Sequence, residues 1–117
     1  MSRVCIYHNP RCSKSRQALA LLEQQGDELE VVEYIDNPPD SATLSALLQQ
    51  LGMSARDLMR KGEETYRELK LDNPDLSEAE LVQAMVDYPR LIERPIVIRD
   101  GKAIVARPPE KVLELYP

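Results

Sequence analysis

A cysteine with basic neighbours lies where a predicted strand meets a predicted helix. Cys12 belongs to the run His8-Asn9-Pro10-Arg11-Cys12-Ser13-Lys14-Ser15-Arg16. Backbone N–H groups at the start of a helix have no partners within that helix, and the helix dipole makes this end positive. Both effects favour a thiolate over a thiol, and Arg11, Lys14 and Arg16 add positive charge. Because helix starts also bind anions, the segment predicts thiol chemistry on a small anionic substrate.

The mechanism predicted for this cysteine uses one thiol. The residue three positions after Cys12 is Ser15, where dithiol redox enzymes carry the second cysteine of a Cys-x-x-Cys motif. No disulfide can form within the motif, so an external thiol such as glutathione, or a partner protein, must resolve Cys12. We expect the Ser15 hydroxyl to donate a hydrogen bond that favours the thiolate. The other cysteine, Cys5, lies mid-strand between apolar residues, a position typical of inert packing.

The single histidine, His8, precedes the cysteine by four residues. Its role is open: it could influence or position the thiolate, or simply end the strand, and we do not assign it as a base. A Cys-His-Asp arrangement of the protease kind would need His8 itself. One histidine and two cysteines in different settings offer no known ligand spacing, so we expect no metal site.

Three arginines are candidates for binding an anion. Arg60 lies near a predicted helix end, whereas Arg94 and Arg107 each precede a proline at the start of the third strand and after the fourth. A following proline favours an extended conformation at both positions. Strand ends at one edge of a sheet can converge on the loop that holds Cys12. The alternative is solvated surface charge, and spacing alone does not separate the two.

The order of the predicted elements defines a fold class. In chain order we expect a strand at 3–7, a helix at 13–25, a strand at 29–35, helices from about 40 to 90, a hairpin of 96–98 and 103–105, and a short helix at 110–115. The βαβ unit implies two parallel strands. A βαβ half followed by a ββα half is the plan of the thioredoxin-like fold. We therefore predict an α/β protein with a mixed four-stranded sheet, in one domain of residues 1–117 with a helical insertion at about 40–90.

Composition narrows the class of protein. A chain of 117 residues with 43% hydrophobic and 30% charged residues is typical of one soluble domain. The net charge of −5 argues against a general nucleic-acid binder but allows a local basic pocket. No apolar run approaches the ~20 residues of a membrane span, and the first residues lack a signal-peptide pattern. With only two cysteines, these features predict a cytoplasmic protein with reduced thiols.

As an ensemble, these residues resemble the glutathione- and glutaredoxin-coupled class of arsenate reductases in the thioredoxin-like superfamily. The matching segments are residues 6–10, 12, 15–16, 37–39, 58–61, 91–97 and 107–108. The chain ends at Pro117, where other members often carry a longer tail, so it is similar to a short-form branch of the family.

The resemblance implies an activity and roles for individual residues. The thiolate of Cys12 would attack arsenate, and Arg60, Arg94 and Arg107 would bind the oxyanion and its adducts. Glutathione would then add as co-substrate, glutaredoxin would remove the mixed disulfide, and arsenite would leave, with no bound cofactor. Pro95 would be the proline, usually cis in this fold, that faces the active-site loop. We take His8, Ser15 and Arg16, together with Pro95, as supporting residues of the site.

Two other functions stay open at this point. A glutathione-dependent thiol oxidoreductase acting on another substrate, such as protein mixed disulfides, needs Cys12 but not the three arginines. A non-enzymatic, redox-linked transcription regulator that binds RNA polymerase, as in a related branch of the superfamily, would sense redox state through Cys-x-x-Cys. Ser15 removes that disulfide switch.

Overall fold

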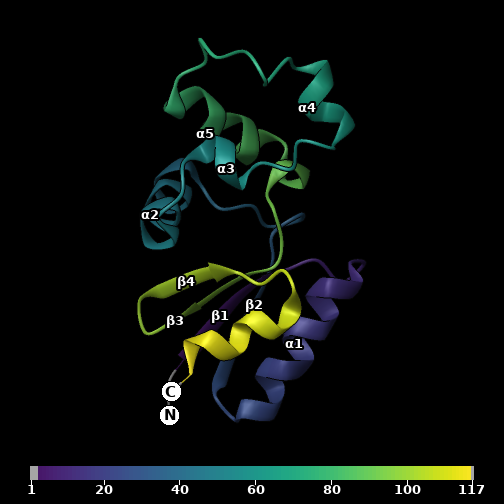
Figure 1. Ribbon diagram of the computed structural model, residues 1–117, viewed down its shortest axis with the longest axis vertical. Coiled ribbons are helices and arrows are strands. Elements are labelled where there is room, and N and C mark those ends of the chain that lie inside the picture. Colours follow the sequence, from purple (N-terminus) through teal and green to yellow (C-terminus); the bar gives the residue numbers. More distant parts are fainter. Residues whose placement is uncertain (1–2, 117) are drawn as a thin grey trace. The chain divides into compact units, whose positions relative to one another are not determined.

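Strands from the first and last thirds of the sequence form one mixed sheet (Figure 1). The computed structural model describes residues 3–116, and in this part of the chain four strands form one sheet in the order β2-β1-β3-β4. The strands are β1 (Arg3–His8), β2 (Glu28–Glu33), β3 (Ile96–Arg99) and β4 (Lys102–Val105). β1 is parallel to β2 and antiparallel to β3, which is antiparallel to β4. The predicted mixed four-stranded sheet is therefore confirmed.

The first half of the sheet is the predicted βαβ unit. Helix α1 (Ser13–Gln25) connects β1 to β2, and its bounds agree with those predicted from the sequence. Cys12 is the N-cap residue, and Gly26 ends the helix with φ at +81°, a left-handed conformation in which glycine has no Cβ to clash. β2 ends at Glu33 rather than at the predicted residue 35.

The second half is the predicted hairpin followed by a helix. Asp100 and Gly101 connect β3 to β4 with φ values of +52° and +80°, which the type I′ hairpin turn requires. The short helix predicted at 110–115 is the segment η2 (Pro109–Leu115), which is a 3-10 helix. Its end bonds join residues three apart, as from the N–H of Lys111 to the carbonyl of Pro108 at 3.0 Å.

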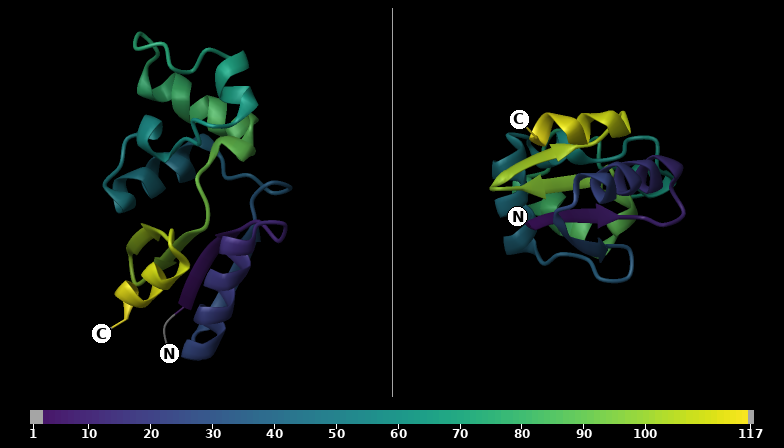
Figure 2. Two further views of the ribbon diagram at one scale, coloured as in Figure 1. Left: turned by 45° about the vertical axis from the view of Figure 1, so that its right-hand side comes forward. Right: turned by 90° about the horizontal axis from the view of Figure 1, so that it is seen from below.

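The core of this half of the protein lies between the sheet and two helices. Side chains alternate along β1, so that Val4 and Ile6 are buried on the face that α1 covers. Helix η2 packs beside α1 (Figure 2). The buried cluster consists of Val4, Ile6, Ala18, Leu22, Val97, Ala106, Val112 and Leu115. This packing holds the first turn of α1, and with it Cys12, at the end of β1.

Residue contacts divide the chain into two units, one of residues up to Asn37 together with those from Arg94 onward, and one of Pro38–Glu93. The second unit is helical. Its elements are α2 (Ser41–Leu51), α3 (Ala55–Leu58), α4 (Glu64–Glu68), α5 (Glu78–Asp87) and the 3-10 turn η1 (Pro89–Leu91). Ser77 and Glu80 form the capping box that starts α5, as the sequence predicts. No helix within residues 3–116 combines the length and apolar character that a membrane crossing requires.

Candidate active site

The loop between β1 and α1 is folded tightly around Cys12. The N–H of Cys12 donates to the carbonyl of Asn9 at 3.0 Å, and the N–H of Arg11 donates to the Asn9 side-chain oxygen at 3.0 Å. From the first turn of α1, the guanidinium of Arg16 donates to the carbonyl of Pro10 at 2.8 Å. Arg16 therefore supports the loop through its backbone. The loop leaves the Cys12 thiol half-buried.

The surroundings of Cys12 lower the pKa of its thiol. Burial is the largest single influence, and it raises the pKa. Hydrogen bonds from the backbone of Ser15 and Lys14 and from the Arg94 side chain act the other way, as does the positive charge of Arg94, and together they outweigh burial. The helix start therefore stabilises a thiolate, with Arg94 as the cationic side chain that completes the effect.

Arg94 reaches the thiol from the chain segment just before β3. Its peptide bond to the buried Pro95 is cis. Burial works against the charge of the half-buried guanidinium, but hydrogen bonds and charge interactions with Cys12 and Tyr34 raise its pKa further above the ordinary value. Arg94 is thus a permanent positive charge beside the sulfur. The structure brings together Cys12 and Arg94, which are 82 residues apart in the sequence.

Tyr34 is a site residue that sequence reasoning missed. It directly follows β2, and only 1% of its surface is exposed. β1 lies between β2 and β3, with His8 opposite Glu33 and Tyr7 opposite Ile96. Tyr34 and Arg94 therefore flank the end of β1 from its two sides, and the Tyr34 side chain interacts with the guanidinium. The one signal in the sequence is the place of Tyr34 at the end of a strand parallel to β1.

His8 and Ser15 form a buried pair beneath the loop. The Ser15 hydroxyl and His8 Nδ1 share a hydrogen bond of 2.7 Å, and the N–H of Asn9 donates to the same hydroxyl at 3.0 Å. Burial lowers the pKa of His8; Glu33 opposes this effect and Arg16 reinforces it. The sequence predicts a hydrogen bond from the Ser15 hydroxyl to the thiolate. In the structure the hydroxyl is engaged by His8 and Asn9, and the bond to Cys12 comes from the Ser15 backbone.

The other two predicted arginines lie in different settings. Arg107, directly after Ala106 and β4, is exposed, and its Nη1 donates to the Arg94 carbonyl at 3.2 Å. The structure therefore brings Arg107 to the backbone of Arg94. Arg60 belongs to the helical unit, where it pairs with Glu63 and Glu93. A pocket shared by all three arginines remains a prediction.

The two cysteines differ in the pKa of their thiols, which is lowered for Cys12 and raised for Cys5. Cys5 lies in β1 opposite Glu30, and burial, followed by the charge of Glu30 and a hydrogen bond with it, raises the pKa of its thiol to about 11. This thiol stays protonated at neutral pH and is a poor nucleophile. Within residues 3–116, no group of three or more His, Cys, Asp and Glu side chains could hold a metal ion.

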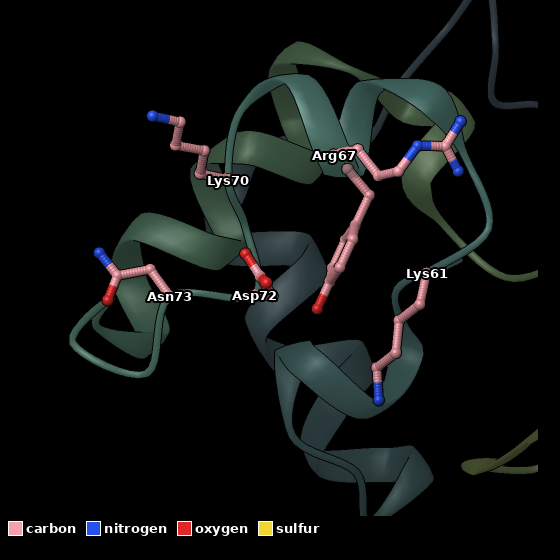
Figure 3. Close-up of a pocket in the computed structure, with 6 residues that line it drawn as sticks. Lys61, Arg67, Lys70, Asp72 and Asn73 are labelled. Carbon is pink, nitrogen blue, oxygen red and sulfur yellow. The ribbon is translucent and has the colours of Figure 1, made fainter.

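A hollow of about 550 Å³ lies in the helical unit and includes none of the predicted site residues. It is lined by Lys61, Tyr66, Arg67, Lys70, Asp72 and Asn73 (Figure 3). Its three cations form no ion pair with any residue in the part of the chain that the structure describes.

These pKa shifts predict selective alkylation of Cys12. At pH 7 we expect iodoacetamide to modify Cys12 and to leave Cys5 unmodified. The rate should fall as the pH is lowered through the depressed pKa of Cys12, with a midpoint below the ~8.5 of an ordinary thiol. Mass spectrometry of the two cysteine peptides measures both rates. Equal rates at pH 7, or a midpoint at the ordinary value, would contradict the prediction.

Replacing Tyr34 with phenylalanine should weaken the hold on Arg94. We expect the pKa of Cys12 to rise and its alkylation at pH 7 to slow by roughly two- to tenfold, since one side-chain hydrogen bond is lost. Tyr66→Phe, a change at a buried tyrosine of the helical unit, is the matched control and should leave the rate unchanged. An unchanged rate in Tyr34→Phe, with circular dichroism like the wild type, would contradict the assignment.

The fold is that of the thioredoxin-like class, and it places a cysteine whose pKa is lowered at the start of α1. The chain matches the ArsC family over residues 7–115, and it belongs to that family. It is 60% identical to the Escherichia coli K12 protein named "Uncharacterized protein YfgD", over 97% of this chain and 96% of that one. It is 51% identical to a protein of Neisseria meningitidis serogroup A named "Arsenate reductase", over 96% and 97%.

A solved structure shows the same fold. The structure named "Arsenate reductase from Vibrio cholerae" aligns with a TM-score of 0.95 at 50% identity and covers 98% of both chains. The resemblance to the arsenate reductase family and the thioredoxin-like fold predicted from the sequence are thereby confirmed.

Proposed function

We propose that the protein is an arsenate reductase that converts arsenate to arsenite through the thiolate of Cys12, with glutathione and glutaredoxin supplying the electrons. The observation that carries the proposal is the contact of the Cys12 thiol with Arg94 at the start of α1. It combines a nucleophile with a cation suited to an oxyanion. Relatives named as arsenate reductases, 50% and 51% identical over nearly their full lengths, support arsenate as the substrate.

The proposed reaction begins with attack of the Cys12 thiolate on arsenic. An oxygen of arsenate leaves as water, and a sulfur–arsenic bond forms. A glutathione thiolate then attacks the sulfur of Cys12: the S–S bond forms as the S–As bond breaks, the electron pair stays on arsenic, and arsenite leaves. Glutaredoxin then reduces the mixed disulfide between Cys12 and glutathione. Overall, arsenic gains two electrons and is released as arsenite, while two thiol sulfurs lose two electrons and become one disulfide. One thiol in the protein suffices because the second is external, in keeping with Ser15 three residues after Cys12.

The arginines would bind the oxyanion and the charge on its adducts. Guanidinium groups donate paired, charge-assisted hydrogen bonds that suit a tetrahedral oxyanion. We assign this role to Arg94 and Arg107, which meet at the Arg94 backbone, and to Arg60 of the helical unit. His8, Ser15 and Arg16 would hold the loop.

The test is an assay of arsenate-dependent NADPH oxidation by the purified protein, coupled through glutathione, glutathione reductase and glutaredoxin. We expect turnover that requires arsenate, glutathione and glutaredoxin together. A parallel reaction replaces arsenate with a small mixed disulfide of glutathione. Turnover of the disulfide alone, with Cys12 still reacting as a low-pKa thiolate, would reject arsenate reduction in favour of a thiol oxidoreductase with another substrate.

A further inference from the structure

Two carboxylates hold the guanidinium of Arg60. Its Nη1 lies 2.9 Å from Glu63 Oε1, and its Nε lies 3.5 Å from Glu93 Oε1. The side chains are 25% exposed for Arg60, 28% for Glu63 and 30% for Glu93, so solvent screens these pairs only in part. We call Glu63 and Glu93 the carboxylate clamp.

Backbone hydrogen bonds position both members of the clamp. Met59 and Ile92 form an antiparallel bridge, flanked by bonds from the N–H of Arg60 to Leu91 at 2.7 Å and from the N–H of Glu93 to Leu58 at 2.9 Å. This bridge sets Arg60 and Glu93 on neighbouring chain segments. A bond of 3.2 Å from the N–H of Glu63 to the Arg60 carbonyl closes the turn that returns Glu63 to the guanidinium. Less conformational entropy is therefore lost when these ion pairs form.

The two carboxylates lie at nitrogens that belong to the two different edges a guanidinium offers to a bidentate ligand. One edge consists of Nε and Nη2, and the other of Nη1 and Nη2. Glu63 accepts a hydrogen bond from Nη1, and Glu93 lies 3.5 Å from Nε, so a carboxylate stands beside one nitrogen of each edge. A tetrahedral oxyanion that approaches either edge of Arg60 therefore meets a negative charge next to the donors it would use.

The compensation of charge at Arg60 does not extend to the cation next to it in the sequence. Its neighbour Lys61 lines the open hollow of the helical unit and pairs with no carboxylate among residues 3–116 (Figure 3). Glu64 directly follows Glu63 and is exposed, and the ion pairs of the described residues do not include it. Of these two adjacent glutamates, Glu63 therefore pairs with Arg60 and Glu64 does not.

We propose that the carboxylate clamp sets the oxyanion affinity of Arg60, because an oxyanion must compete with two glutamates for the charge and the donors of this guanidinium. The inference rests on the proposed function, which assigns Arg60 to the oxyanion pocket. Glu63 and Glu93 are then residues that determine affinity without touching the reacting atoms. Their negative charges also oppose the approach of an anion, so the clamp raises the KM for arsenate.

The experiment compares arsenate kinetics of Glu63→Gln, Glu93→Gln and the double variant. Glutamine keeps the shape and a hydrogen-bonding oxygen but loses the charge. We expect KM to fall by roughly threefold in each single variant and roughly tenfold in the double variant, the scale of partly exposed ion pairs, with kcat within about twofold of wild type. Glu64→Gln removes the same charge one residue away and should leave KM unchanged. An unchanged or raised KM in the double variant would overturn the clamp.

A second set separates this inference from the proposed function. Arg60→Ala should raise KM, and on that background the glutamine changes should lower KM by much less than they do in wild type. If Arg60→Ala raises KM but the glutamine variants match wild type, the clamp fails and the reductase stands. If no variant turns over arsenate, calorimetric titration with arsenate decides: tighter binding in the double variant than in Glu64→Gln supports the clamp, and equal binding rejects it.

Discussion

Replacing Cys12 with serine is expected to abolish arsenate-dependent NADPH oxidation, with a loss of roughly a thousandfold or more, as for removal of a nucleophile in general. A hydroxyl remains protonated where the thiol of Cys12 ionises, and an alcohol oxygen cannot pass two electrons to arsenic through a disulfide. The structure stabilises a thiolate at this position with hydrogen bonds from Ser15, Lys14 and Arg94. The coupled assay measures the loss.

The matched control is Cys5→Ser, the same substitution at the other cysteine. Because the pKa of Cys5 is raised to about 11, its thiol takes no part in the proposed reaction, and we expect kcat/KM to stay within about twofold of wild type. Circular dichroism shows whether both variants fold. Retained turnover in folded Cys12→Ser would place the chemistry elsewhere in the protein.

Replacing Arg94 with alanine is expected to reduce arsenate turnover by roughly a hundred- to a thousandfold, the scale for removing one preorganised donor from a charged transition state. The same change should raise the pKa of Cys12, because a hydrogen bond and a positive charge at the sulfur are lost. The steady-state assay measures the first effect, and the pH dependence of iodoacetamide alkylation measures the second.

Two further variants make the Arg94 result specific. Arg67→Ala removes an exposed arginine of α4 and should leave both turnover and the pKa of Cys12 unchanged. Arg94→Lys keeps a charge but not the paired donors, so we expect it to restore the low pKa more than the turnover. Full arsenate turnover in folded Arg94→Ala would contradict the oxyanion role. Lost arsenate turnover together with retained reduction of a small mixed disulfide would support it.

Local patterns in the sequence were sufficient to predict the order of elements, the mixed sheet and the position of Cys12 at a helix start. These features depend on neighbouring residues: the apolar periodicity of residues 13–25, the stop at Gly26 and the Asp100-Gly101 turn. The position of Cys12 at a helix start follows from the same signals, and this position explains the backbone hydrogen bonds from Lys14 and Ser15 that lower its pKa. The sequence does not predict whether the last helix is α-helical or 3-10, because the two kinds of turn share their residue preferences over so short a segment.

The contacts between side chains of the site could not be predicted from the sequence. Arg94 reaches the Cys12 sulfur and Tyr34 reaches Arg94, since β1 lies between β2 and β3 in one particular register. The Ser15 hydroxyl bonds to His8 rather than to Cys12 because both side chains are buried side by side. Arg60, predicted as a cation for the oxyanion, is held by two glutamates, one of them 33 residues away. Spacing along a chain reports local conformation, whereas these contacts depend on strand register and packing between residues far apart in sequence.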